Sequence, residues 1–214
     1  MAKVILHGPD YSTHVRTARL CLAEKGVDHE LKPVDLFRGA NRKPDYLRLH
    51  PFGRVPVLEH DGFTLYETSA ITRYVDEAFK GLKLQPSDKK EVARMSQIVS
   101  IIAAYGHEPI VTNIALPRAQ QVFLKRPIDP AQIRTALPRA RHCLSVIQDL
   151  MGDGPFLVGK SPTLADLHLA PVIAFFALTP EGKRMLPKLT RLAAWWEMMA
   201  ERPSVIETRP AAAG

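Results

Sequence analysis

The sequence predicts an α/β layer of about 80 residues followed by an all-helical domain. Strand-like and helical patterns alternate from Lys3 to Phe79. The stretch Lys80–Ser87 reads as a linker, and no convincing strand follows it. We therefore expect two domains, at residues 1–81 and 88–208.

The composition is that of an ordinary globular protein, with 46% hydrophobic and 24% charged residues among 214. No apolar run approaches the ~20 residues that a membrane span needs. Because the chain enters a strand directly after Met1, we expect no signal peptide. Cys21 and Cys143 fall in separate helical patterns, which does not favour a disulfide framework. A reducing cytoplasm is the expected location.

The formal net charge of +7 suits anionic ligands in general. The basic residues are scattered, without a run of five or six, so nucleic-acid binding is not favoured. The surplus is better explained by a solvated surface and by local attraction for an anionic small molecule. The eight histidines show no ligand spacing, and no metal site is expected.

The first strand is expected at Lys3–His7, where an apolar run ends at Gly8-Pro9-Asp10. Apolar residues then recur at helical spacing from Val15 until the helix stop Lys25-Gly26. A second strand is expected at His29–Val34. Because the chain must cross over through the helix, these two strands should be parallel and the connection right-handed.

Next come a short helical or irregular region at Arg42–His50 and two short strands, Pro56–Glu59 and Phe63–Tyr66. The strands are joined by His60-Asp61-Gly62, a tight hairpin with Asp-Gly at its tip. A helix over Glu67–Phe79 completes the order β-α-β-(α)-β-β-α.

The second domain should begin with a long helix from Asp88 to about Leu116, kinked at Pro109 because proline removes one backbone hydrogen bond. A loop fenced by prolines is expected next (Pro117, Pro127, Pro130). Apolar spacing predicts another helix over Ile133–Met151, with Pro138 near its first turns.

Thr163 and Asp166 are spaced as the acidic variant of a capping box, in which each side chain satisfies the other residue's backbone N–H. We expect this pair to stabilise a helix that runs to about Leu178. A last helix is predicted at Leu189–Glu201, and residues 210–214 are expected to form a loose tail.

Two segments of the α/β layer suggest a ligand. If the Val55–Pro56 peptide bond is cis, the chain turns sharply and leaves the amide and carbonyl of Val55 free at a surface. The helix start at Glu67-Thr68-Ser69 offers unpaired backbone N–H groups, a hydroxyl and a carboxylate at one point. Together they could hold a small peptide-like ligand by its backbone and its charged ends.

The combination of these motifs resembles the cytosolic glutathione transferases over roughly residues 3 to 204. The motifs are Pro51-Phe52-Gly53-Arg54-Val55-Pro56, Glu67-Thr68-Ser69-Ala70-Ile71, Thr163-Leu164-Ala165-Asp166-Leu167 and Glu201-Arg202-Pro203. The resemblance implies a thioredoxin-like N-terminal domain followed by a C-terminal helical bundle. It also implies glutathione as co-substrate, bound without a metal.

The resemblance assigns the γ-glutamyl end of glutathione to Glu67 and Thr68. Glu67 would pair with the ligand ammonium, and Thr68 would hold the carboxylate at a positive helix end. Val55, which precedes the expected cis-proline Pro56, would exchange backbone hydrogen bonds with the cysteinyl part. Arg54 matches a position that often contacts the ligand through its side chain.

The glycine carboxylate is usually met by basic or polar residues before the turn. Asn41 and Arg42 fall there, with Lys43 a weaker candidate. His50 stands where that turn often has asparagine, a change that we expect to be neutral.

For catalysis, Ser12 matches the serine of phi-like and theta-like members, with neighbouring Tyr11 as the alternative. A hydroxyl at a helix N-terminus would stabilise the glutathione thiolate and lower the thiol pKa, so the nucleophile would be the ligand's own sulfur. No cysteine occupies this position, which argues against the thiol-transferring members.

The second substrate, a small hydrophobic electrophile, should bind between the domains, near Tyr11 and near Tyr105, His107, Glu108 and Val111 around the expected kink. The resemblance further implies detoxification chemistry, a homodimer and the possibility of peroxidase activity. Two alternatives stay open: a non-catalytic ligand-binding or scaffold protein on the same fold, and an isomerase or dehalogenase that uses the same site. The electrophile itself is not predicted.

Overall fold

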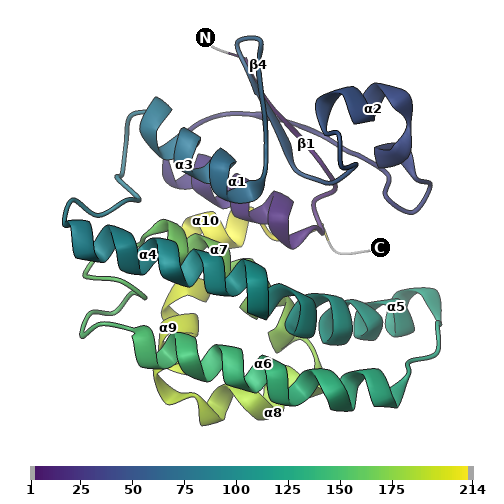
Figure 1. The fold of residues 1–214 in the computed structure, drawn as a ribbon, viewed down its shortest axis with the longest axis vertical. Coiled ribbons are helices and arrows are strands. Elements are labelled where there is room, and N and C mark those ends of the chain that lie inside the picture. Colours follow the sequence, from purple (N-terminus) through teal and green to yellow (C-terminus); the bar gives the residue numbers. More distant parts are fainter. Residues whose placement is uncertain (1–2, 212–214) are drawn as a thin grey trace. The chain divides into compact units, whose positions relative to one another are not determined.

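The computed structural model describes residues 3–211, which form two compact units (Figure 1). The N-terminal unit comprises the described residues up to Lys83 together with those from Arg202 onward. The helical unit comprises Leu84–Glu201. The α/β and all-helical fold classes expected from the sequence are confirmed.

The N-terminal unit is built on a four-stranded sheet in the order β2-β1-β3-β4. The strands are β1 (Val4–His7), β2 (Glu30–Lys32), β3 (Val57–His60) and β4 (Phe63–Tyr66). As predicted, β1 and β2 are parallel, with Leu6 opposite Leu31. The other two pairings are antiparallel, and Leu6 also lies opposite Leu58 of β3. Leu6 and Leu58 are fully buried in the sheet.

Helices cover both faces of this sheet (Figure 1). Helices α1 (Thr13–Glu24) and α3 (Thr68–Ala78) lie side by side on one face. The other face carries the short 3-10 helix η1 (Ala40–Arg42) and helix α2 (Pro44–Leu49). Tyr46 of α2 packs with Val34 and Val57 in a small core beneath that helix.

The α1–α3 interface contains a buried ion pair at its far end. The ammonium of Lys25 contacts the Asp76 carboxylate at 3.1 Å and donates to the Asp76 carbonyl at 3.0 Å. It also donates to the carbonyl of Leu82 at 3.0 Å. Since a buried charge is tolerated only when paired and hydrogen-bonded, these contacts fix α1, α3 and the chain after α3 together.

Helix α10 (Pro203–Glu207), which the sequence did not predict, packs on α1 within the N-terminal unit. Arg202 pairs with Glu24 at 2.7 Å, and the Ser204 hydroxyl donates to the same carboxylate. The expected second domain reached residue 208, whereas by its contacts the chain returns to the first unit at Arg202. Part of the expected tail, residues 212–214, lies outside the described residues.

The helical unit contains a bundle of α-helices with two π-helical stretches. Its elements are α4 (Lys89–Ile101), η2 (Ile102–Gly106), η3 (Glu108–Ala115), α5 (Leu116–Leu124), α6 (Pro130–Leu150), α7 (Leu164–Ala177), α8 (Pro180–Met185), η4 (Leu186–Lys188) and α9 (Thr190–Ala200). Within residues 3–211, no single helix has the length and hydropathy to cross a membrane. Helix α7 and the segment Pro180–Lys188 pass that test only together, and they meet at 102°.

One proline prediction needs correction, and the backbone at Pro109 differs from a regular α-helix. The loop expected to begin at Pro117 begins later, because Pro117 lies in the first turn of α5, where a missing N–H costs no helical bond. Around Pro109 the backbone is π-helical: the N–H of His107 bonds the carbonyl of Ile102, five residues earlier. Such wider turns accommodate a residue that cannot donate.

Asp166 of α7 is completely buried and accepts four hydrogen bonds. The N–H and hydroxyl of Thr163 each donate at 2.8 Å, the Leu157 N–H at 2.9 Å and the Trp195 indole at 2.8 Å. Burial raises the pKa of this carboxyl, opposed by the four donors. The carboxylate therefore joins the helix cap, the preceding loop and α9.

Candidate functional site

The segments singled out for ligand binding meet at one edge of the N-terminal unit. Gly8, which follows β1, has φ of +148° and lies so close to Val55 that an added Cβ would be 3.3 Å from the Val55 Cβ. Thr68 at the start of α3 lies 3.3 Å from the ring of His14 in the first turn of α1. The starts of α1 and α3 and the Val55–Pro56 turn therefore form one neighbourhood.

Ser12 is the N-cap of α1 and is half-buried. Its hydroxyl oxygen accepts a long hydrogen bond, 3.4 Å, from the N–H of Val15. Because this bond uses an oxygen lone pair, the hydroxyl proton stays available to donate to another atom. The N-terminus of a helix also favours a nearby negative charge.

Tyr11, the alternative hydroxyl, is 42% exposed and packs against Phe37 with ring centroids 5.7 Å apart. Burial and the carboxylates of Asp35 and Asp10 raise the pKa of its phenol. A raised pKa makes this phenol a weaker acid, and so a weaker hydrogen-bond donor to an anion, than an ordinary tyrosine.

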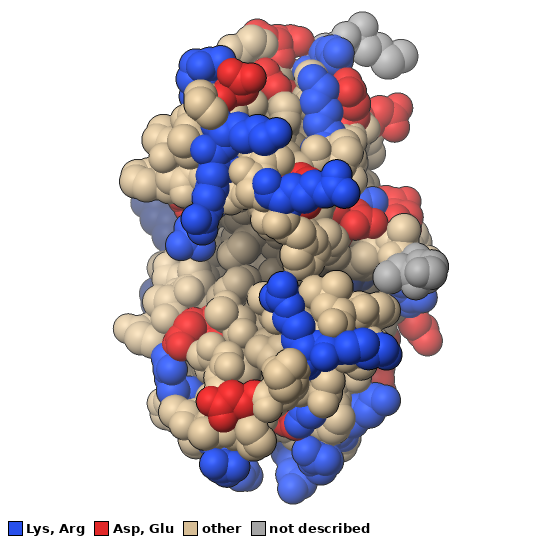
Figure 2. Space-filling view, turned by 90° about the vertical axis from the view of Figure 1, so that its right-hand side faces the viewer, with Lys and Arg blue, Asp and Glu red and all other residues tan. Residues whose placement is uncertain are grey.

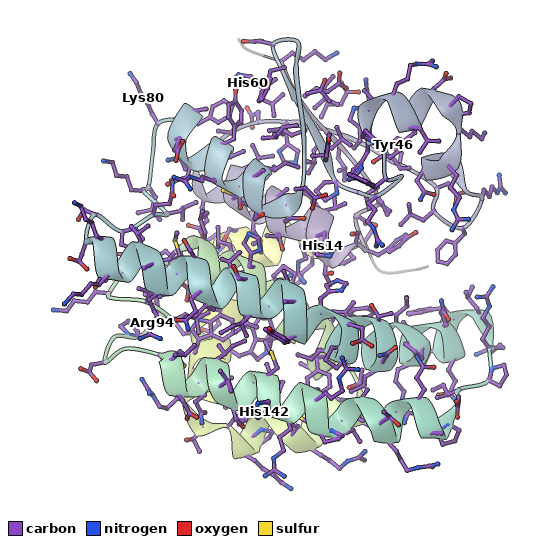
Figure 3. The ribbon with its side chains drawn as sticks, in the orientation of Figure 1. His14, Tyr46, His60, Lys80, Arg94 and His142 are labelled. Carbon is purple, nitrogen blue, oxygen red and sulfur yellow. The ribbon has the colours of Figure 1, made fainter. Side chains whose placement is uncertain are left out.

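The Val55–Pro56 peptide bond is cis. Among the described residues, no backbone hydrogen bond to Val55 is formed. The turn is supported from below, because the Tyr46 hydroxyl donates to the carbonyl of Arg54 at 2.8 Å. Figure 3 labels Tyr46 between α2 and the sheet. Burial raises the pKa of the Tyr46 phenol, so the hydroxyl keeps its proton and remains a donor. This support was not predicted from the sequence.

Glu67 immediately precedes α3 and has a positive φ of 70°, a conformation that costs a non-glycine residue energy and often marks a functional site. Its side chain is exposed. The first bond of the helix joins the N–H of Ile71 to the Glu67 carbonyl, so the N–H groups of Thr68 and Ser69 precede the helical ladder. A carboxylate, a hydroxyl and two helix-terminal N–H groups thus lie together.

His50 lies under this edge and was expected to matter little. Its ring stacks on Tyr66, with centroids 4.7 Å apart, and its buried Nδ1 has no hydrogen-bond partner within residues 3–211. Burial lowers the pKa of His50, an effect that the nearby Glu67 carboxylate opposes and Arg54 reinforces. The imidazole is therefore a neutral packing group beside the charged edge at neutral pH.

Arg42 and Arg54 line an open cavity of about 410 Å³ beside the turn. Neither guanidinium pairs with a carboxylate anywhere in the described part of the chain. Lys and Arg side chains gather on the face of this unit that carries α2 (Figure 2). Two guanidinium groups without a carboxylate partner among the described residues give this cavity a positive charge, which favours anions.

Asn41 also lines this cavity, but its amide donates to the Gly53 carbonyl at 2.6 Å. Its first role is therefore to brace the turn. Lys43 is the exposed N-cap of α2 and does not contribute to the cavity wall.

The residues expected around the second substrate differ in their surroundings. Tyr105 is 66% exposed, His107 is half-buried and Val111 is buried. The Glu108 carboxylate is bound by Arg139 and by Asn113, whose hydrogen bonds hold its pKa below the usual range. Glu108 is thus engaged within the helical unit.

Among residues 3–211, no three His, Cys, Asp or Glu side chains are grouped so that they could hold a metal ion.

Comparison with known proteins matches residues 11–78 to the glutathione S-transferase N-terminal domain and residues 130–197 to the glutathione S-transferase C-terminal domain. Glutathione S-transferase F13 of Arabidopsis thaliana is 30% identical over 207 residues, which cover 96% of this chain and 94% of that protein. The chain belongs to the glutathione S-transferase family.

Solved glutathione S-transferase structures agree with this assignment. Glutathione transferase F7 from Populus trichocarpa is 29% identical with a TM-score of 0.85, covering 96% of this chain and 97% of that one. A structure of glutathione S-transferase I bound with lactoylglutathione is 25% identical with a TM-score of 0.83, covering 96% and 98%. The activity of this chain is accordingly that of a glutathione transferase.

Proposed function

We propose that this transferase activates glutathione by donating a hydrogen bond from Ser12 to the ligand sulfur. The observation that carries the proposal is the Val15 N–H bonded to the Ser12 oxygen at 3.4 Å, which leaves the hydroxyl proton for the ligand. A donor and a positive helix end both stabilise thiolate over thiol. The thiol pKa, about 8.5 in free cysteine, would fall towards neutral pH.

The γ-glutamyl end would bind at the start of α3. The exposed Glu67 carboxylate would accept from the ligand ammonium. The Thr68 hydroxyl and the helix-terminal N–H groups would donate to the ligand carboxylate, which the positive helix end also attracts. This arrangement explains why a residue with a strained backbone stands at position 67.

The rest of the ligand would extend along the turn. The backbone N–H and carbonyl of Val55 match the paired donor and acceptor of the cysteinyl residue, beside Pro56. Arg54 and Arg42 would bind the glycine carboxylate in the cavity that they line, with Asn41 bracing its wall. One similar structure holds lactoylglutathione, a glutathione derivative, which supports a tripeptide site of this kind.

In the reaction, the thiolate sulfur would attack an electrophilic carbon of a small hydrophobic substrate. A sulfur–carbon bond forms, and either a leaving group departs with its electron pair or an activated double bond takes up a proton from water. The thiol proton has by then passed to solvent. Tyr11, Tyr105 and His107 stay the candidate contacts for the electrophile; Tyr11 and Tyr105 are exposed and His107 is half-buried.

Detoxification of such electrophiles, a homodimeric assembly and a cytoplasmic location complete the proposal. Glutathione is the thiol of reducing compartments, and the two cysteines of the chain are free and buried.

The test compares wild type with Ser12→Ala and Tyr11→Phe. Glutathione binding is measured by calorimetry, and thiolate formation is followed by ultraviolet absorbance across pH. We expect wild type and Tyr11→Phe to bind glutathione and form thiolate near neutral pH. Ser12→Ala should still bind, with the thiol pKa back towards its free value and turnover reduced about a hundredfold. If Ser12→Ala forms thiolate as wild type does, Ser12 is not the activator.

A further inference from the structure

Polar contacts join α1 to α3 once per turn of α3. The ring of His14 meets Thr68, the thiol of Cys21 donates to the Thr72 carbonyl at 3.4 Å, and Lys25 binds Asp76. The latter two are buried contacts deep in the interface. The His14 contact differs, since it joins two half-buried side chains at the N-termini of both helices. Figure 3 labels His14.

The direction of the His14–Thr68 hydrogen bond decides what Thr68 can do. The two atoms, Nδ1 of His14 and Oγ1 of Thr68, lie 3.3 Å apart. A threonine hydroxyl has one proton and two lone pairs. If His14 accepts, it consumes the only proton that Thr68 could offer to a ligand. If His14 donates, it uses a lone pair and leaves that proton free.

We propose that His14 donates its Nδ1–H to Oγ1 of Thr68 and thereby directs the Thr68 proton to the α-carboxylate of the γ-glutamyl group. His14 is a positioning residue for glutathione that acts through Thr68. The inference rests on the proposed function, which gives Thr68 to that carboxylate. A carboxylate has lone pairs but no proton, so the hydroxyl must donate to it.

The same turn of α1 arranges both hydroxyls in the same way. Ser12 accepts from the Val15 N–H. In the proposed arrangement Thr68 likewise accepts from His14, which lies two residues after Ser12 and 3.3 Å from the Thr68 hydroxyl. Each hydroxyl has a lone pair engaged by a donor of α1, and each proton is left for the ligand. The first turn of α1 would thus set the donor direction at the thiol and at the γ-glutamyl end together.

The experiment measures glutathione affinity by calorimetry for wild type, His14→Leu, His14→Asn, Thr68→Val and the double variant His14→Leu/Thr68→Val. Removing one hydrogen bond to a charged group should weaken binding about tenfold in His14→Leu and in Thr68→Val. The double variant should be no weaker than Thr68→Val alone, because both changes remove the same bond. Asparagine keeps an N–H donor near the position of Nδ1, so His14→Asn should recover most of the affinity.

Two measurements separate the role of His14 in positioning Thr68 from an effect of the substitution on folding. At saturating glutathione, kcat of His14→Leu should stay near that of wild type while KM for glutathione rises by the same factor as the dissociation constant. Cys21→Ala removes a contact deeper in the same interface and should lower the unfolding midpoint without changing glutathione affinity. Thermal unfolding of each variant shows that it is folded.

The outcomes show whether a failure concerns the role of His14 or the proposed glutathione transferase mechanism as a whole. If wild type does not bind glutathione, the proposed function fails and the inference with it. If wild type binds but His14→Leu binds within twofold of it, only the role of His14 is overturned. Additive losses in the double variant, or an asparagine variant as weak as the leucine variant, would likewise overturn it.

Discussion

A Cβ atom added to Gly8 would lie 2.3 Å from Cγ2 of Val15, closer than two carbon atoms approach in a folded protein. It would also lie 3.3 Å from the Cβ of Val55. The absence of a side chain at position 8 thus allows the chain after β1, the first turn of α1 and the cis-proline turn to meet. The positive φ of 148° adds a backbone reason for glycine.

Gly8→Ala should therefore displace two parts of the site at once. We expect a loss of about 2 kcal/mol or more in unfolding free energy, from overpacking and from the unfavourable φ. Glutathione affinity should fall as well, because the added Cβ would meet Val55 and Val15, and the N–H of Val15 bonds Ser12. Chemical denaturation and calorimetry measure the two effects.

Gly62→Ala is the matched control. Gly62 also has a positive φ, 84°, but no atom lies within 4 Å of its added Cβ. Its substitution should cost backbone energy and leave the affinity for glutathione unchanged. Equal effects of the two variants on affinity would show that packing at Gly8 does not shape the site.

The two arginines of the open cavity should bind the glycine carboxylate specifically. Arg42→Gln and Arg54→Gln are each expected to raise KM for glutathione about tenfold, because each removes a charge-assisted hydrogen bond. With γ-glutamylcysteine, which lacks the glycine, both variants should match wild type. A tenfold loss with that dipeptide would assign the arginines to another part of the ligand. Lys43→Gln, outside the cavity wall, serves as control.

Asp166 should be essential for stability and remote from catalysis. Asp166→Ala leaves four buried donors without an acceptor, so we expect a loss of about 3 to 5 kcal/mol in unfolding free energy. Thr163→Ala removes one donor and should cost about 1 kcal/mol. Denaturant unfolding measures both losses. If Asp166→Ala instead lost little unfolding free energy but changed KM for glutathione, Asp166 would be a ligand contact.

His168 should make stability depend on pH. Burial lowers its pKa to about 4 in the folded protein, against about 6.5 unfolded. The folded imidazole is neutral while the unfolded chain takes up a proton below pH 6.5, so stability is lost as the pH falls from 6.5 towards 4. Between pH 7 and pH 5, wild type should lose about 2 kcal/mol more than His168→Gln. If wild type and His168→Gln lost the same unfolding free energy between pH 7 and pH 5, His168 would not be the source of the pH dependence.

The cysteines should be inert in the native protein. Burial raises the pKa of Cys143 to about 11 and raises that of Cys21 further. Because the thiolate is the reactive form, thiol reagents should label neither residue until the chain unfolds. Mass spectrometry before and after denaturation checks this. Labelling of Cys143 alone under native conditions would point to local opening of α6.

Most of the N-terminal unit was predictable because its signals are local. A short apolar run marked the first strand, and Lys25-Gly26 and Asp61-Gly62 marked a helix end and a hairpin. Helix α10 was missed because five residues give too short a pattern, and its stability comes from Glu24 and Arg16 far away in sequence. Pro117 was misjudged because a proline in a first helical turn and a proline in a loop look alike in sequence.

The site residues were predicted from sequence motifs. A motif identifies the residues that contact a ligand but not the neighbouring side chains that hold them in position. The sequence could not show that Tyr46 holds the Arg54 carbonyl or that His14 contacts Thr68, since these pairs are brought together only by the packing of α2 and of α1 against α3. It also could not show that the Asn41 amide is committed to Gly53. The assignment of each ligand contact stays a prediction.

The return of the chain to its first unit has a consequence for synthesis on the ribosome. The helical unit is continuous from Leu84 to Glu201, whereas the N-terminal unit needs Arg202 and α10. Until those last residues emerge, Glu24 lacks Arg202 and Ser204, and Arg16 lacks the Val205 carbonyl that its guanidinium binds at 2.9 Å. The N-terminal unit, which is synthesised first, therefore completes its own contacts last. A nascent chain stalled before Arg202 carries a glutathione-binding unit that still lacks α10 and its contacts to α1.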